Sequence, residues 1–152
     1  MLDAIDVKII SRLVKNGRIS LTELATGTDL SRVAIANRID RLMKFGVLKV
    51  SALVNLEKLN YQTLIVEMQI EKPKIQQFRK LISTESRVLQ CFEIAGPFNF
   101  MLVCTAQNNN HLRSFLDDTL KKFSKDCKVT LSSNPLLPEF VHVKDLEGLK
   151  WS

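Results

Sequence analysis

Residues 21–48 constrain the fold of this 152-residue chain most strongly, because they predict two helices joined by a tight turn. Ser31 is a favourable N-cap for the second of these helices, and Gly46 lies where a C-cap glycine is expected. Between them, an apolar stripe at helical spacing predicts one buried face. The stripe consists of Ile35, Ile39 and Leu42.

The opposite face of this helix is polar and basic, as in the recognition helix of a helix-turn-helix motif. It carries Val33, Asn37, Arg41 and Lys44, with Arg32 and Arg38 beside the apolar stripe. A short helix before it and the turn Gly27-Thr28-Asp29 complete the outline of that motif. An ordinary solvated helix would show the same charged face, so both interpretations stay open at this point.

A further amphipathic segment, Asp3–Asn16, predicts a helix before the motif and hence a trihelical unit. Either Ser20 or Thr22 is a suitable cap for the second helix. Residues 47–54 are rich in β-forming side chains and predict a wing or a linking strand. The expected core of the unit is Ile9, Leu13, Ile19, Leu24, Leu30, Ile35, Ile39 and Leu42.

The net charge of +6 and the isoelectric point near 9.4 favour a polyanionic partner. The excess is densest in residues 1–60, which hold ten Lys and Arg against six Asp and Glu. No apolar stretch approaches the roughly 20 residues needed to span a bilayer, and the acidic start lacks the features of a secretory signal. We therefore expect a cytoplasmic protein without a membrane partner.

In the second half of the chain, segments with the alternation of strands are interspersed with segments that have the apolar spacing of helices. Pro73 opens a helix at a permitted position, and Asn108–Asn110 cap another. The expected strands are residues 63–71, 87–95, 100–106 and 129–132, with 140–143 as a further candidate. The order βαββαβ predicts a ferredoxin-like domain. Such a sheet has helices on one face only, so the apolar residues of its other face argue for a dimer.

The three cysteines show no metal-binding spacing, and no cofactor is expected. If the second hairpin turns on Pro97 and Phe98, Cys91 falls opposite Cys104. Reduced, buried thiols are nevertheless the favoured state in a cytosolic protein.

Two motifs carry a resemblance that extends over nearly the whole chain. The first is LDAIDVKIISRLVKNGRIS at the start, and the second is LSRVAIANRIDRLMKFGVL. With a βαββαβ domain behind them, they resemble the Lrp/AsnC (feast/famine) family of transcriptional regulators. The resemblance implies DNA binding, assembly into dimers or larger oligomers, and response to an amino acid.

One turn departs from the pattern of that family, which has Gly-Asp-(Phe/Tyr)-Asp between the second and third strands. Here the turn is Gly96-Pro97-Phe98-Asn99, without either carboxylate. Where the family often has Thr-x-Thr, this chain has Ser132-Ser133-Asn134. The expected effector residues are thus Gly96, Pro97, Phe98, Asn99, Ser132 and Asn134. Whether an effector binds there stays open.

DNA recognition needs cations near phosphates and a few side chains at base edges. Asn37 is suited to hydrogen bonding with adenine, and Val33 to contact with a thymine methyl group. Ser31 is suited to capping the helix. For Arg38, pairing with an acid such as Glu23 or Asp40 is an equal alternative to a phosphate contact. The expected DNA-binding set is Ser31, Arg32, Val33, Asn37, Arg38, Arg41 and Lys44, with Arg18 and Lys49 as flanking candidates.

An enzyme is not expected, because His111 and His142 have no catalytic partner at a recognisable spacing. The enzyme alternative is a haem-biosynthesis decarboxylase, since some of these share the two-domain layout. Another alternative is a small-molecule-sensing module with little DNA role.

The sequence therefore predicts an α+β chain with an N-terminal winged helix-turn-helix (trihelical) domain and a ferredoxin-like βαββαβ domain. Its expected parts are residues 1–50 for DNA binding, 51–61 as a strand linker, and 62–152 for effector binding and oligomerisation. A homodimer, assembled further into a tetramer or octamer, would present two recognition helices to a palindromic operator in double-stranded DNA.

Overall fold

The computed structural model describes residues 2–124, 126–132 and 141–145. The chain divides into a first unit of residues 1–51 and a second unit of residues 52–152. Of the segment 51–61, which is expected to act as a linker, residues 52–61 belong to the second unit. Leu56 and Tyr61 are buried there in a small cluster, and Val54 pairs with Val141.

The first unit contains the three expected helices: α1 (Ala4–Lys15), α2 (Leu21–Ala25) and α3 (Arg32–Lys44). Ser20, not Thr22, caps α2, in a capping box with Glu23. Ile9, Leu24 and Ile35 form the buried centre, with neighbours that include Leu13, Ile19, Leu30 and Ile39. The predicted core of the unit is confirmed.

The expected wing is not formed. Over residues 47–54, the only strand pairing within the described part of the chain is the single bridge between Val54 and Val141. An extended segment becomes a stable strand only when a neighbouring strand satisfies its backbone groups. The β-rich composition of this segment therefore does not by itself make it a strand. The same bridge is all that is seen of the candidate strand 140–143, of which Phe140 lies outside the described residues.

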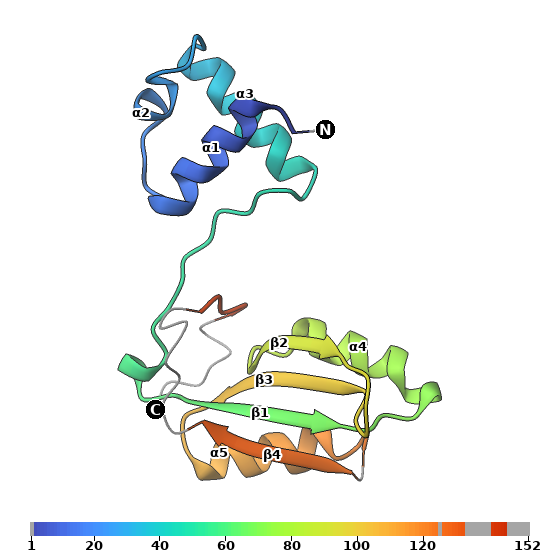
Figure 1. Cartoon of the computed structure of the whole chain (residues 1–152). Helices are drawn as coiled ribbons and strands as arrows, with labels where there is room; N and C mark the ends of the chain where they lie inside the picture. The colour runs from blue at the N-terminus through green and yellow to red at the C-terminus, as the bar shows by residue number, and fades with distance from the viewer. Residues whose placement is uncertain (1, 125, 133–140, 146–152) are drawn as a thin grey trace. The chain divides into compact units, whose positions relative to one another are not determined.

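The second unit contains β1 (Gln62–Met68), α4 (Ile75–Thr84), β2 (Val88–Glu93), β3 (Phe100–Ala106), α5 (Asn109–Ser114) and β4 (Cys127–Ser132). The strand order is β2-β3-β1-β4, and every neighbouring pair is antiparallel. This is the predicted βαββαβ arrangement, with α4 and α5 on one face of the sheet (Figure 1).

The core of the second unit lies between those helices and the sheet. Leu64, Val66 and Met68 of β1 alternate inward against Phe78 of α4 and Phe115. The Phe78 ring packs edge-to-face on Phe100 and Phe123, with centroids 5.0 and 5.5 Å apart. The opposite sheet face keeps Ile65 36% and Phe92 43% exposed.

Two local features differ from expectation. The helix that begins at α5 continues as a π-helical turn, Phe115–Leu120, where continuous α-helix was expected. The hairpin is not centred on Pro97 and Phe98: the Ile94 N–H donates to the Asn99 carbonyl and Glu93 pairs with Phe100, so that Cys91 faces Leu102 and not Cys104. All three cysteines are free thiols, but only Cys104 is buried as expected, whereas Cys91 and Cys127 are half-buried. Burial raises the pKa of Cys104 far above its ordinary value.

Candidate nucleic-acid interface and ligand cavity

The expected recognition helix, α3, has well-defined ends. The Ser31 hydroxyl accepts a hydrogen bond from the Ala34 backbone N–H at 3.2 Å, as an N-cap does. Beyond the helix, Gly46 adopts a φ of 67°, a left-handed conformation that favours glycine. The structure thus supports a capping role for Ser31.

The two faces of α3 differ as the periodicity predicted. Ile35 and Leu42 are buried, with exposures of 0% and 2%, and Ile39 packs beside them. The side chains of the expected DNA-contacting face are exposed, and Val33 is 69% exposed although it is apolar. The exposed set is Arg32, Val33, Asn37, Arg41 and Lys44.

Arg38 and Arg41 do not stand free on this helix. Arg38 Nη1 lies 2.8 Å from Asp6 Oδ1 and 2.6 Å from Asp3 Oδ2, and Arg41 Nη2 lies 2.6 Å from Asp6 Oδ2. Arg38 therefore pairs with acids, as one of the two expected alternatives had it, but the acids are Asp3 and Asp6 and not Glu23 or Asp40. Glu23 instead accepts hydrogen bonds from the Ser20 backbone and hydroxyl.

Asp6 is the fully buried member of this cluster, which we call the α1–α3 ion cluster (Asp3, Asp6, Arg38 and Arg41). Burial alone would raise the pKa of Asp6, but hydrogen bonds from Arg38 and the Asp3 backbone, with the charge of Arg41, lower it overall. The hydrogen bond from Arg38 also lowers the pKa of Asp3. Two carboxylates and two guanidinium groups balance, so the cluster holds α3 against α1 without adding net charge.

Helix α1 also holds α2, through two cations that sequence reasoning missed. Arg12 Nη1 donates to the carbonyl oxygens of Glu23 at 2.6 Å and Thr26 at 3.0 Å. The Lys8 ammonium group donates to the carbonyl of Gly27. Cations are favourable at these positions because the last carbonyls of a helix lack partners and carry partial negative charge. One helix therefore positions both parts of the helix-turn-helix.

The expected effector residues do not form one site within a chain. The Asn99 side chain accepts from the Ile70 N–H and donates to the Ile70 carbonyl, each at 2.8 Å, so it supports the hairpin structurally. That hairpin, with exposed Gly96 and Pro97 and partly buried Phe98, adjoins the Met68 end of β1. Ser132 pairs with Thr63 at the other end, and Asn134 lies outside the described residues.

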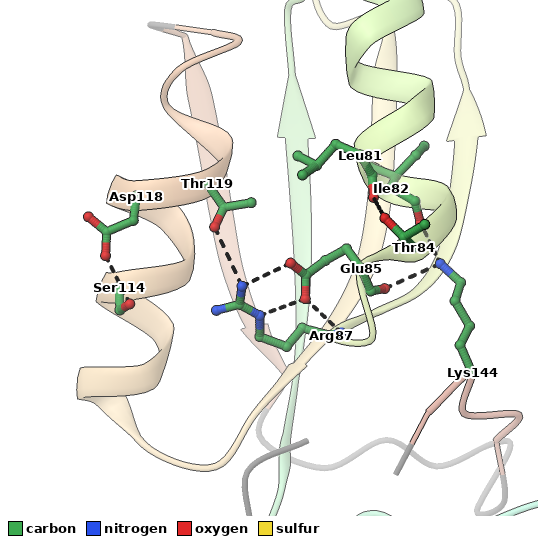
Figure 2. A network of polar contacts seen from close by, with 9 residues as sticks. All are labelled: Leu81, Ile82, Thr84, Glu85, Arg87, Ser114, Asp118, Thr119 and Lys144. Carbon is green, nitrogen blue, oxygen red and sulfur yellow. Dashed lines mark hydrogen bonds and ion pairs between the residues drawn. The ribbon is translucent and has the colours of Figure 1, made fainter. Parts of the chain in front are cut away.

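A cavity of about 540 Å³ lies at the end of β2 and β3 away from this hairpin. Its walls are the end of α4, the turn into β2, the end of β3 and the face of α5 with its π-helical continuation. Glu85 and Arg87 both line the cavity and form a two-point ion pair (Figure 2). Sequence reasoning missed these residues, although an acid and an arginine two positions apart in a turn are a visible signal.

Other chemistry finds little support in the part of the chain that the structure describes. It contains no group of three or more His, Cys, Asp or Glu placed to hold a metal ion. Among the same residues, no helix combines the length and apolarity needed to cross a bilayer.

The fold and its exposed basic helix define a helix-turn-helix protein with a separate α+β domain. Residues 2–43 match the family model for the AsnC-type helix-turn-helix domain, and residues 63–135 match that for the Lrp/AsnC ligand binding domain. The chain belongs to the Lrp/AsnC family of DNA-binding transcriptional regulators, as the resemblance predicted.

Individual relatives agree with this assignment. The regulator LrpC of Bacillus subtilis is 32% identical over 120 residues, which cover 78% of this chain and 83% of the relative. The leucine-responsive regulatory protein of Haemophilus influenzae is 33% identical, covering 78% and 75%. The crystal structure of the Mycobacterium tuberculosis leucine response regulatory protein has the same fold, with a TM-score of 0.81 at 23% identity over 93% of this chain and 99% of that one.

Proposed function

We propose that α3 enters the major groove of operator DNA and reads its sequence through the exposed face. The observation that carries this proposal is the exposed, capped helix held by α1 through the α1–α3 ion cluster. An α-helix fits the major groove, where base edges present distinct donors and acceptors. The proposed contacts are Arg32, Val33, Asn37 and Lys44, with Ser31 as the cap.

Each proposed contact has a separate chemical role. Asn37 has the amide geometry that pairs with adenine, and Val33 offers an apolar surface to a thymine methyl group. Arg32 and Lys44 lie at opposite ends of α3, where they can contact phosphates. Arg38 and Arg41 are assigned a positioning role, because both bind Asp6.

We further propose that the active form is a homodimer, assembled into a tetramer or octamer. Ile65 and Phe92 remain exposed on the sheet face that α4 and α5 leave uncovered, and large exposed apolar patches mark interfaces. A two-fold dimer would recognise a palindromic operator in cytoplasmic chromosomal DNA, with half-sites about one helical turn apart. The protein is then a regulator, not an enzyme.

The ligand-binding-domain match and the leucine-responsive relative support modulation by a small molecule, with amino acids as the first class to test. Such an effector changes DNA binding only if its affinity differs between two states of the assembly. The hairpin residues 96–99 are one candidate location.

The experiment is selection of bound genomic fragments by the full-length protein, followed by binding measurements at several salt concentrations. Asn37→Ala should weaken binding to the selected operator by roughly 5- to 150-fold and relax the sequence preference of the protein. Lys44→Ala should weaken binding to all DNA sequences alike and reduce the slope of log affinity against log salt concentration by about one.

Lys15→Ala is the matched control, because Lys15 is likewise an exposed lysine in the last turn of a helix, α1. It should bind as the wild type does. Equal binding by all three variants, or a monomeric protein without preference for any duplex, would contradict the proposal.

A further inference from the structure

Residues 141–145, which we call the strap, hold the first residues of the second unit in place. The Val54 N–H donates to the Val141 carbonyl at 2.9 Å, and the Val141 N–H donates to the Val54 carbonyl at 3.0 Å. Residues 49–53, which precede this bridge, are exposed and form neither helix nor strand. The strap therefore fixes the point at which the chain enters the second unit.

The loop that follows Val54 packs beneath the strap. It folds through the 3₁₀ turn η1 (Glu57–Leu59) and buries Leu56 and Tyr61, which are 4% and 7% exposed. Val143 of the strap packs against these two side chains, and so does Leu89 of β2. A bulge in β2 leaves Leu89 without a partner of its own in β3, and bulges often redirect a side chain in this way. Loop, strap and bulge thus form one apolar cluster of their own.

Lys144 joins the strap to the end of α4. Its ammonium group donates to the carbonyl oxygens of Ile82 at 2.6 Å and Glu85 at 3.3 Å (Figure 2). A cation is favourable there, because the last carbonyls of a helix lack partners and carry partial negative charge. The strap is therefore attached at two places, the bridge to Val54 and the end of α4.

These attachments are weaker than the sheet beside them. The pair of Val54 and Val141 is an isolated bridge, whereas β1 pairs along its length with both β3 and β4. Val143 is only half-buried, and Lys144 is exposed. Segments with few buried contacts and exposed hydrogen bonds open at a lower free energy than the core of a domain. We therefore expect residues 54–61 to detach while the sheet stays intact.

The strap shares two contacts with the cavity. Tyr61 belongs to the cluster beneath the strap and also lines the cavity. Glu85 lines the cavity as well, and its carbonyl accepts from Lys144. A movement of either residue acts both on the cavity wall and on the contacts that hold the strap. The two are therefore coupled through one local structural element.

We propose that the strap sets the length of the tether, meaning the chain between α3 and the first fixed residue of the second unit. With the strap closed, the tether ends at Val54. With the strap open, residues 54–61 join the tether, which then ends at Gln62, where β1 begins. Eight more residues add up to about 26–29 Å of reach in an extended chain. The proposal rests on the proposed function, because tether length limits the half-site spacings that two α3 helices of a dimer reach together.

The test is Lys144→Met in the full-length protein, digested briefly with trypsin under native conditions. Lys58 lies in η1, and a protease cleaves within such a folded loop only after the loop opens. The initial rate of cleavage after Lys49, in the exposed segment, is the internal reference. Because two hydrogen bonds are lost, cleavage after Lys58 relative to Lys49 should rise by about tenfold. Lys80→Met removes another exposed lysine, from α4, and should leave the ratio unchanged. An unchanged ratio in Lys144→Met would overturn the proposal.

Val54→Cys combined with Val141→Cys gives the opposite change. Hydrogen-bonded antiparallel pairs have Cα atoms about 5.5 Å apart, within the range that a disulfide spans. Added to Lys144→Met and oxidised, this pair should return cleavage after Lys58 to the wild-type rate or below, and reduction should restore fast cleavage. Fast cleavage in the oxidised protein would show that the loop opens without the strap, and would overturn the proposal.

DNA binding then tests the role of the tether. Two copies of the selected half-site are placed either about one helical turn apart or roughly five base pairs out of phase. The wild type should prefer the first duplex, and Lys144→Met should reduce that preference by at least about threefold. An unchanged preference despite fast cleavage after Lys58 would overturn the tether role. A wild-type protein without preference for any duplex sequence would overturn the proposed function, whereas cleavage that depends on Lys144 would still support the strap.

Discussion

In the first unit, two arginines share one buried carboxylate, whereas in the second unit a single arginine is held by one carboxylate and a ring. Asp6 is fully buried and accepts from both Arg38 and Arg41, so every charge in that cluster joins helix to helix. Arg87 binds Glu85 on one edge and keeps a nitrogen toward a cavity. The same pair of residue types can therefore join two helices or brace a turn beside a cavity.

The two clusters differ in which residue type is shared: the carboxylate in the first unit and the arginine in the second. A fully buried carboxylate between two arginines is out of reach of a ligand, and losing it leaves Arg41 without its acid partner and Arg38 with Asp3 alone. A central arginine has five N–H donors, more than one carboxylate can accept. We therefore expect changes in the first cluster to act on the packing of α1 against α3, and changes in the second to act on the turn before β2 and its contact with Phe115.

The largest effect should follow from Asp6→Ala. This change removes the acid partner of Arg41, one of the two acid partners of Arg38, and one half of the capping box at the start of α1. Because both arginines are partly exposed and can be rehydrated, we expect a loss of roughly 2–3 kcal/mol, below that of a fully buried pair. Chemical denaturation followed by circular dichroism measures it.

Asp29→Ala, an exposed acid in the turn before α3, is the control and should cost far less. If Asp6→Ala unfolded at the same denaturant concentration as the wild type, the α1–α3 ion cluster would not hold the helices together.

Arg87→Lys should have the next largest effect. Lysine keeps the positive charge but cannot bond both oxygens of Glu85 and stack on Phe115 at the same time. We expect a loss of about 1–2 kcal/mol in unfolding free energy. Arg113→Lys, at an exposed position of α5, should be nearly neutral. Equal losses in both variants would contradict the assigned role of the Arg87 geometry.

A smaller effect is expected for Asn99→Asp, which restores the acidic residue typical of the family turn. The carboxylate can still accept from the Ile70 N–H but cannot donate to the Ile70 carbonyl, so about 1 kcal/mol of stability should be lost. Thermal unfolding of the full chain measures the change. A gain in stability would show that the hairpin end of the sheet does not depend on this amide.

The smallest effect is expected for Asp6→Asn, on the dependence of folding stability on acidic pH. The pKa of Asp6 is lowered in the folded chain, so its contribution is present above its ordinary pKa near 4 and is lost as the pH falls below that value. Asp6→Asn removes this dependence. The variant should therefore lose less of its neutral-pH stability when the pH is lowered. The midpoint of its acid unfolding should shift by about a few tenths of a pH unit less than the loss of neutral-pH stability alone would give. An unchanged slope would contradict the assignment.

Local patterns in the sequence were enough to predict both halves of the fold. Helical spacing and the Ser31 cap predicted α3, and strand alternation predicted the βαββαβ order that the structure contains. These features depend on neighbours a few residues away, which a single sequence displays directly. The exposed face of α3 could be predicted for the same reason.

Tertiary contacts decided what the local pattern left open. Asp6 and Arg38 are 32 positions apart, and only helix packing chooses Asp6 over Glu23 or Asp40 as the partner. The position of the turn, with Ile94 bonded to Asn99, placed Cys91 opposite Leu102 and not Cys104. Residues 47–54 formed no wing because, in the described chain, their only strand pairing is the bridge between Val54 and Val141. The cavity likewise exists because the ends of α4, β3 and the π-helical turn meet around Arg87. Sequence spacing determines which residues share a face, but packing alone determines which faces meet.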